Sequence, residues 1–124
     1  MLKHIANKPS EEFYTDERCH IVELLNDDSS PQLSIARCRV EAGVQTQLHA
    51  LDQVEETYFI ESGSGVMDDG EGNLFEVGVG DGVKIDKNHP QRIRNTSKSD
   101  LIFLVVCQPR FLPECYLNLE NVVS

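Results

Sequence analysis

Short runs of alternating apolar and polar residues, separated by turn-forming clusters, recur along most of this chain. The clusters are rich in Gly, Asn, Asp and Ser, as in DDGEGN at 68–73 and GVGDG at 78–82. This pattern predicts an all-β sandwich or barrel of short strands. The strands predicted in this way are His20–Leu25, Leu33–Glu41, Thr46–Leu51, Glu56–Glu61, Gly65–Met67, Leu74–Val77, Gly82–Ile85, Gln91–Arg94 and Leu101–Cys107.

One strand and the tail stand out from this pattern. The run LIFLVV at 101–106 is apolar at every position, which predicts a central strand covered on both faces. The only helix candidate follows Pro113, which could occupy the first helical position, and it is long enough for a turn or two. The 124 residues suit a single domain. We expect an N-terminal arm and edge strand at 1–32, the barrel at 33–110, and a tail with a short helical turn at 111–124.

The composition restricts the partners and the compartment. A net charge of −10 argues against nucleic acid and against an anionic membrane surface, both of which attract basic proteins. No apolar run is long enough to span a bilayer or to serve as a signal peptide, which predicts a cytoplasmic protein. The 4 cysteines form no C-x-x-C pair, so we expect reduced thiols, with Cys38 and Cys107 as small core residues.

Two segments carry residues at distinctive spacings. The first, GVQTQLHALDQVEETYFIESG, runs from Gly43 to Gly63, and the second, GDGVKIDKNHPQRIRN, runs from Gly80 to Asn95. Together they resemble the paired motifs of the cupin family, and the resemblance covers roughly 33–107. Gly43, His49, Glu56, Gly63, Gly80 and Asn95 fall at the family's positions. Leu51 and Gln91 replace two of its histidines, and Asp86 and Asn88 replace its Pro and Gly.

The resemblance implies a double-stranded β-helix, a jelly-roll barrel of two sheets. It also implies a metal site, because typical cupins hold Fe, Mn, Ni, Zn or Cu with three histidines and one glutamate. The matching positions here are His49, Leu51, Glu56 and Gln91, so the ligands that remain for a divalent metal are His49, Glu56 and Gln91. Leucine cannot ligate, and a glutamine carbonyl is a weaker ligand than imidazole. Glu55 and His89 could be recruited to complete the site.

Strand alternation predicts which side chains face the barrel interior together with these residues. We expect a pocket for a small organic molecule, with a few polar groups on a mainly apolar wall. The expected lining is Gln47, His49, Leu51, Glu56, Tyr58, Ile60, Gln91 and Ile93.

Two kinds of function remain open at this stage. The first is an enzyme that acts on a small metabolite, either through a metal or through acid–base chemistry by His49 and Glu56, with Tyr58 as a further candidate. The second is a non-catalytic module that binds or senses a small ligand and keeps a vestigial metal site. No organic cofactor is expected. Small cupins commonly form homodimers, and the outward-facing Leu48, Ala50 and Phe59 predict an apolar wall for such pairing.

Overall fold

The computed structural model describes residues 1–120, and its regular secondary structure is almost entirely β-strand. Its strands and two 3₁₀ turns are η1 (Pro9–Glu11), β1 (Phe13–Tyr14), β2 (His20–Leu25), β3 (Ser34–Val40), β4 (His49–Leu51), β5 (Glu55–Ser62), β6 (Ser64–Asp68), β7 (Leu74–Gly78), β8 (Gly82–Ile85), β9 (Arg92–Asn95), β10 (Leu101–Gln108), η2 (Pro113–Cys115) and β11 (Tyr116–Asn118). No helix in residues 1–120 is long and apolar enough to cross a membrane.

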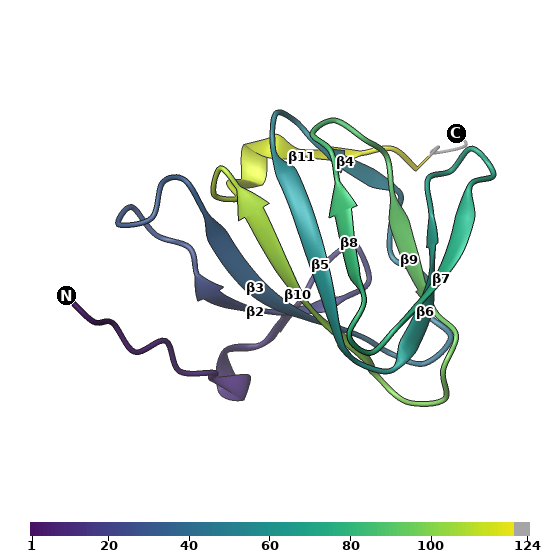
Figure 1. The fold of residues 1–124 in the computed structure, drawn as a ribbon, viewed down its shortest axis with the longest axis horizontal. Helices are drawn as coiled ribbons and strands as arrows, with labels where there is room; N and C mark the ends of the chain where they lie inside the picture. The colour runs from purple at the N-terminus through teal and green to yellow at the C-terminus, as the bar shows by residue number, and fades with distance from the viewer. Residues whose placement is uncertain (121–124) are drawn as a thin grey trace.

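The strands form two walls that face each other (Figure 1). One wall is a sheet in the order β1-β2-β3-β10-β5-β8, in which all pairs are antiparallel. The opposite wall contains β7-β6-β9 and the pair β11-β4. These two parts are joined by isolated bridges between Gln45 and Arg94 and between His49 and Gln91. This is the double-stranded β-helix expected from the sequence.

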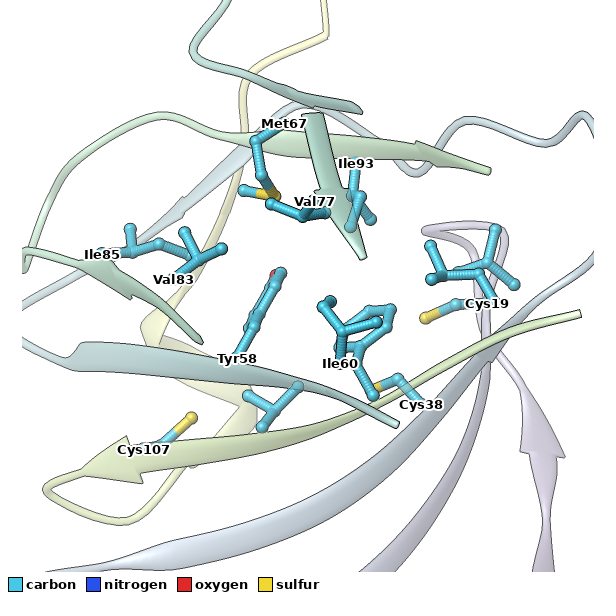
Figure 2. Close-up of a cluster of buried hydrophobic side chains, with 14 of the residues drawn as sticks. Cys19, Cys38, Tyr58, Ile60, Met67, Val77, Val83, Ile85, Ile93 and Cys107 are labelled. Atoms are coloured by element: carbon cyan, nitrogen blue, oxygen red, sulfur yellow. The ribbon is translucent and has the colours of Figure 1, made fainter. Parts of the chain in front are cut away.

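Side chains from both walls fill the space between them (Figure 2). Met67, Val77 and Ile93 point inward from one wall toward Tyr58 and Ile60 on β5 of the other, and all of them are at most 5% exposed. The 4 cysteines are also buried, and all are free thiols. Alternate residues of each strand thus contribute to one core, as the period of a β-strand requires.

The tail closes the barrel next to the first motif. After the 3₁₀ turn η2, β11 pairs with β4, so that Leu117 lies opposite Ala50 and Asn118 opposite His49. Residues after Pro113 therefore form a single turn followed by a strand, where the sequence allowed a second helical turn. The last four residues of the predicted tail, 121–124, lie outside the described part of the chain.

The central strand β10 differs from the prediction on one face. It lies between β3 and β5, as expected, and its inward residues are buried. On the outer face, however, Ile102, Leu104 and Val106 are only partly buried in the single chain. The prediction that both faces would be covered is therefore wrong for the chain alone, because no second layer of residues 1–120 packs over this face.

Candidate functional site

The backbone pairing of two strand segments brings the motif residues together. The N–H of Gln91 donates to the carbonyl of His49 at 2.8 Å, and the N–H of His49 donates back to the carbonyl of Gln91 at 3.1 Å. Residues paired in this way across an antiparallel ladder project their side chains to the same face. His49 and Gln91 therefore both point into the barrel, where they are 2% and 3% exposed.

The side-chain amide of Gln91 connects three other buried groups. Its Nε2 lies 2.8 Å from Nε2 of His49 and 3.0 Å from Oε1 of Glu56. Its Oε1 accepts a hydrogen bond from the hydroxyl of Tyr58 at 3.1 Å. Each atom of this amide thus has a partner of the complementary kind, as buried polar groups require.

The same contacts define the tautomer of His49. Its Nδ1 lies 2.7 Å from the carbonyl oxygen of Gln47, which can only accept, so Nδ1 carries the proton and donates. In the neutral ring Nε2 is then an acceptor, which matches the amide N–H of Gln91. Tyr116 stacks on this ring, with centroids 5.0 Å apart and planes 16° apart. The histidine is therefore held on both nitrogens and on one face.

Glu56 is the one carboxylate buried in this network. Burial raises the pKa of its carboxyl to about 7, although its interactions with His49 and Gln91 act in the opposite direction. Nε2 of His49 lies 3.8 Å from Oε1 of Glu56. Only Oε1 of the two carboxylate oxygens receives the bond from Gln91. Burial also raises the pKa of Tyr58 well above its ordinary value.

A cavity of about 580 Å³ opens beside these residues. Gln47, His49, Leu51, Glu56 and Tyr58 line it, as the alternation predicted. The other expected lining residues have different positions. Gln91 is buried but does not line the cavity, so it bonds to His49, Glu56 and Tyr58 from behind. Ile60 and Ile93 are packed within the hydrophobic core.

The two candidate recruits lie outside the network. His89 is on the surface, with its Nδ1 2.9 Å from the carbonyl of Pro90. Glu55 forms an ion pair with Lys84 at 3.5 Å. Strand alternation explains this placement for Glu55, since Glu56 next to it faces the interior.

Several cavity residues were not expected from the motifs. The hydroxyl of Tyr116 on β11 donates to Oε1 of Gln47 at 2.6 Å, and the same ring covers His49. The hairpin between β1 and β2 contributes Glu17 and Cys19, and β10 contributes Phe103. Cys19, Ile21 and Glu23 line the cavity at alternate positions, so the alternation of the predicted strand at 20–25 could have indicated this face, whereas Glu17 lies in the hairpin turn, where alternation gives no signal.

The donors in this network do not fit a metal ion. They comprise one imidazole, one carboxylate and one amide, whereas catalytic zinc sites use three histidine, cysteine or carboxylate ligands. No three His, Cys, Asp or Glu side chains in residues 1–120 are placed to hold a metal. The amide also presents its N–H group to both His49 and Glu56, so ligation would require its hydrogen bonds to break and its oxygen to turn inward.

Similar solved structures share the fold at low sequence identity. The polyketide cyclase RemF from Streptomyces resistomycificus has a TM-score of 0.80 and 19% identity, covering 98% of this chain and 88% of that chain. Streptomyces Pac13, a nucleoside dehydratase, was solved as a tyrosine-to-phenylalanine variant with uridine. That structure has a TM-score of 0.77 and 18% identity, covering 99% of this chain and 95% of that chain. A predicted oxalate decarboxylase from Thermotoga maritima has a TM-score of 0.70 and 26% identity, covering 80% of this chain and 90% of that chain.

The comparison with protein families identifies the chain more directly. No protein of curated function matches its sequence. The Cupin domain family, in contrast, matches residues 36–107, which is more than half of the chain and includes both motif segments. The fold and the motif spacing agree with this match, and the chain belongs to the cupin family.

Proposed function

We propose that this cupin is a metal-independent acid–base enzyme that acts on a small organic molecule, with Glu56 as the group that transfers the proton. The observation that carries this proposal is the placement of the Glu56 carboxyl on the cavity wall, where Gln91 holds one oxygen from behind. A general acid or base must touch the ligand and keep a fixed orientation. Glu56 lies on the cavity wall, where a bound ligand would reach it, and its hydrogen bond with Gln91 fixes its orientation.

The protonation behaviour of Glu56 suits this role. Because burial raises its pKa to about 7, both the acid and the carboxylate are populated near neutral pH. An acid–base group works best when its pKa lies near the working pH. A carboxyl group with an ordinary pKa would be ionised almost completely there, and so could not donate a proton.

His49 and Tyr58 have positioning roles in this proposal. Both nitrogens of His49 are engaged, Nδ1 with Gln47 and Nε2 with Gln91. The Tyr58 hydroxyl donates to the same amide of Gln91. These contacts orient Gln91, which in turn orients Glu56. The proton that moves to or from the ligand is therefore assigned to Glu56.

The chemistry of two structural neighbours supports an acid–base reaction. Removing water from a molecule requires a base that takes a proton and an acid that protonates the leaving hydroxyl. Closing a ring between carbonyl-activated carbons also begins with proton abstraction. The dehydratase and the cyclase named above share this fold, and their names denote a loss of water and a ring closure. Since their identities to this chain are low, they support the reaction class and leave the substrate open.

Hydrogen exchange with solvent tests this proposal. The protein is incubated in D₂O with a panel of neutral carbonyl and hydroxyl metabolites, and proton NMR follows deuterium incorporation. We expect exchange into one class of compound, and a loss of about 100-fold or more in the isosteric variant Glu56→Gln. Equal exchange by the two proteins would refute the role of Glu56. Activity that is abolished by EDTA and restored by a divalent metal would refute the metal-independent mechanism.

A non-catalytic binding module is the second candidate. One observation favours it: His49, Gln91 and Tyr58 direct their polar atoms at one another rather than into the cavity. A binding module would bind members of the same panel without exchanging their hydrogens, and Glu56→Gln would change affinity alone.

A further inference from the structure

The charges around the cavity are of one sign. Four acidic side chains line it, from Asp16, Glu17, Glu23 and the partly protonated Glu56, and no Lys or Arg in residues 1–120 does so. The remaining lining is largely apolar and includes the rings of Phe103 and Tyr116. In a concave site with low-dielectric walls, charges of one sign produce a strong electrostatic potential, which acts on any ligand that enters.

Basic residues that adjoin the lining along the chain, such as Arg18 and Arg110, are committed elsewhere. Arg18 follows Glu17 directly, but its guanidinium pairs with Glu120 and donates to the carbonyl of Gln45 at 2.9 Å. Arg110 pairs with Asp28 at 2.8 Å. Neither arginine lines the cavity. The negative charge of the cavity is therefore not neutralised by a side chain that faces it.

Glu17 is placed to act on the ligand. It lies in the tip of the hairpin between β1 and β2, and its carbonyl accepts a hydrogen bond from the N–H of Gln47 at 3.1 Å, which ties the tip to the chain entering β4. Glu17 is a half-buried residue that lines the cavity. Burial is the main cause of the raised pKa of Glu56, and the negative charge of Glu17 acts in the same direction.

From this geometry we infer that the cavity accepts uncharged or positively charged organic molecules with an aromatic or apolar body and rejects carboxylates and phosphates, with Glu17 as the residue that sets this preference. The inference rests on the proposed function only in assigning the cavity as the ligand site. An anion that entered would lose its hydration and would gain no cationic partner from the wall. An ammonium group would instead be attracted by Glu17 and by the faces of the aromatic rings.

Three indole compounds of the same skeleton test the charge preference. Tryptamine is cationic at neutral pH, tryptophol is uncharged, and indole-3-acetate is anionic. The chain contains no tryptophan, so indole fluorescence reports the probe alone. We expect indole-3-acetate to bind at least about tenfold more weakly than tryptophol, and tryptamine to bind at least as tightly as tryptophol.

Variants at Glu17 test its assignment. Glu17→Gln should reduce the ratio of tryptamine to indole-3-acetate affinity severalfold, and Glu17→Lys should reduce it further. Glu71→Gln, which removes the same charge from an exposed turn outside the cavity, should leave the ratio unchanged. Equal binding of tryptophol and indole-3-acetate, failure of tryptamine to bind, or equal effects of the Glu17 and Glu71 variants would overturn the inference. These readouts do not involve turnover, so they can fail independently of the role of Glu56.

Discussion

Gln91 determines what this site can do, because it occupies the position at which the second cupin motif has a metal-binding histidine. Its oxygen accepts a hydrogen bond from the Tyr58 hydroxyl, and its N–H group donates to both His49 and Glu56. An imidazole at this position could not serve all three groups in the same way, since it has only two nitrogens. Together with Leu51, this substitution converts a ligand set into a closed hydrogen-bond network around one carboxyl group.

Removing the amide should therefore destabilise the protein strongly. Gln91→Leu leaves polar atoms of three buried side chains without their partner, and such groups cost about 1–3 kcal/mol each in mutational data. We expect the free energy of unfolding to fall by about 3 kcal/mol, measured by urea denaturation. Gln108→Leu, at an exposed position at the end of β10, serves as control and should change it by less than about 0.5 kcal/mol. Similar values for both variants would contradict the network.

The pH dependence of stability should carry the signature of Glu56. Its pKa rises from 4.5 to about 7 on folding, so the folded state binds this proton more tightly than the unfolded state. The resulting stability is fully present below about pH 4.5 and is lost as the pH rises through 7. Relative to Glu56→Gln, whose amide does not titrate, the wild type should lose on the order of 3 kcal/mol across this interval. Parallel profiles for the two proteins would contradict the raised pKa.

The strands of the second wall pack closely enough to exclude a single methyl group at one position. A Cβ at Gly65 on β6 would lie 2.8 Å from the carbonyl oxygen of Arg94 and 3.1 Å from Leu101, whereas a Cβ at Gly78 on β7 would meet nothing within 4 Å. Gly65→Ala should thus lower the free energy of unfolding by about 1–3 kcal/mol. Gly78→Ala should leave it unchanged or raise it slightly. Thermal denaturation measures both variants. Equal effects of the two substitutions would show that Gly65 is not packed tightly against Arg94 and Leu101.

At the level of elements, local patterns predicted most of the strands but not which strands pair. The ranges 20–25 and 82–85 coincide with β2 and β8, because alternation and flanking turns define them locally. β1 and β11 were not predicted. Each is only two or three residues long, and each exists because it pairs with β2 or β4. Pairing between segments as distant as Tyr116 and Leu51 has no local signal.

The same lack of a local signal explains which residues of the candidate site could be predicted from the sequence and which could not. The spacing of the two motifs is enough to place His49, Glu56 and Gln91 around one point. Glu17 and Tyr116 come from the β1–β2 hairpin and the tail, outside both motifs, so their contribution depends on how these segments fold over the barrel. The direction of the Gln91 amide likewise depends on Tyr58, which the sequence identified only as a wall residue or a candidate acid.

For the whole molecule, the outer face of the first wall carries apolar side chains that residues 1–120 leave partly exposed. Phe59 on β5 is 48% exposed and lies opposite the half-buried Leu104 on β10. The prediction that Ala50 contributes to an exposed outer wall is wrong, and Leu48 is only half-buried. Ala50 is buried beside β11, and Leu48 lies against the turn at Gly70. The remaining face around Phe59 is the one that fits the predicted homodimer.

A charge at Phe59 should separate such a dimer. Burying each Phe59 would contribute roughly 2 kcal/mol, so Phe59→Asp should shift the equilibrium to monomer at micromolar concentration. Phe75→Asp is a matched control, since Phe75 is 53% exposed on β7 in the opposite wall. Sedimentation velocity gives the result. A monomeric wild type, or a dimer dissociated equally by both substitutions, would refute an interface at this face.

The proton of Glu56 is the most direct test of a metal-independent acid–base site. Carbon-13 NMR of the Glu56 carboxyl, assigned with Glu56→Gln and titrated with and without added zinc, measures its pKa in the folded protein. A midpoint near 7 that zinc leaves unchanged is the predicted result. A midpoint near the ordinary 4.5, or one that zinc lowers at stoichiometric concentration, would contradict it.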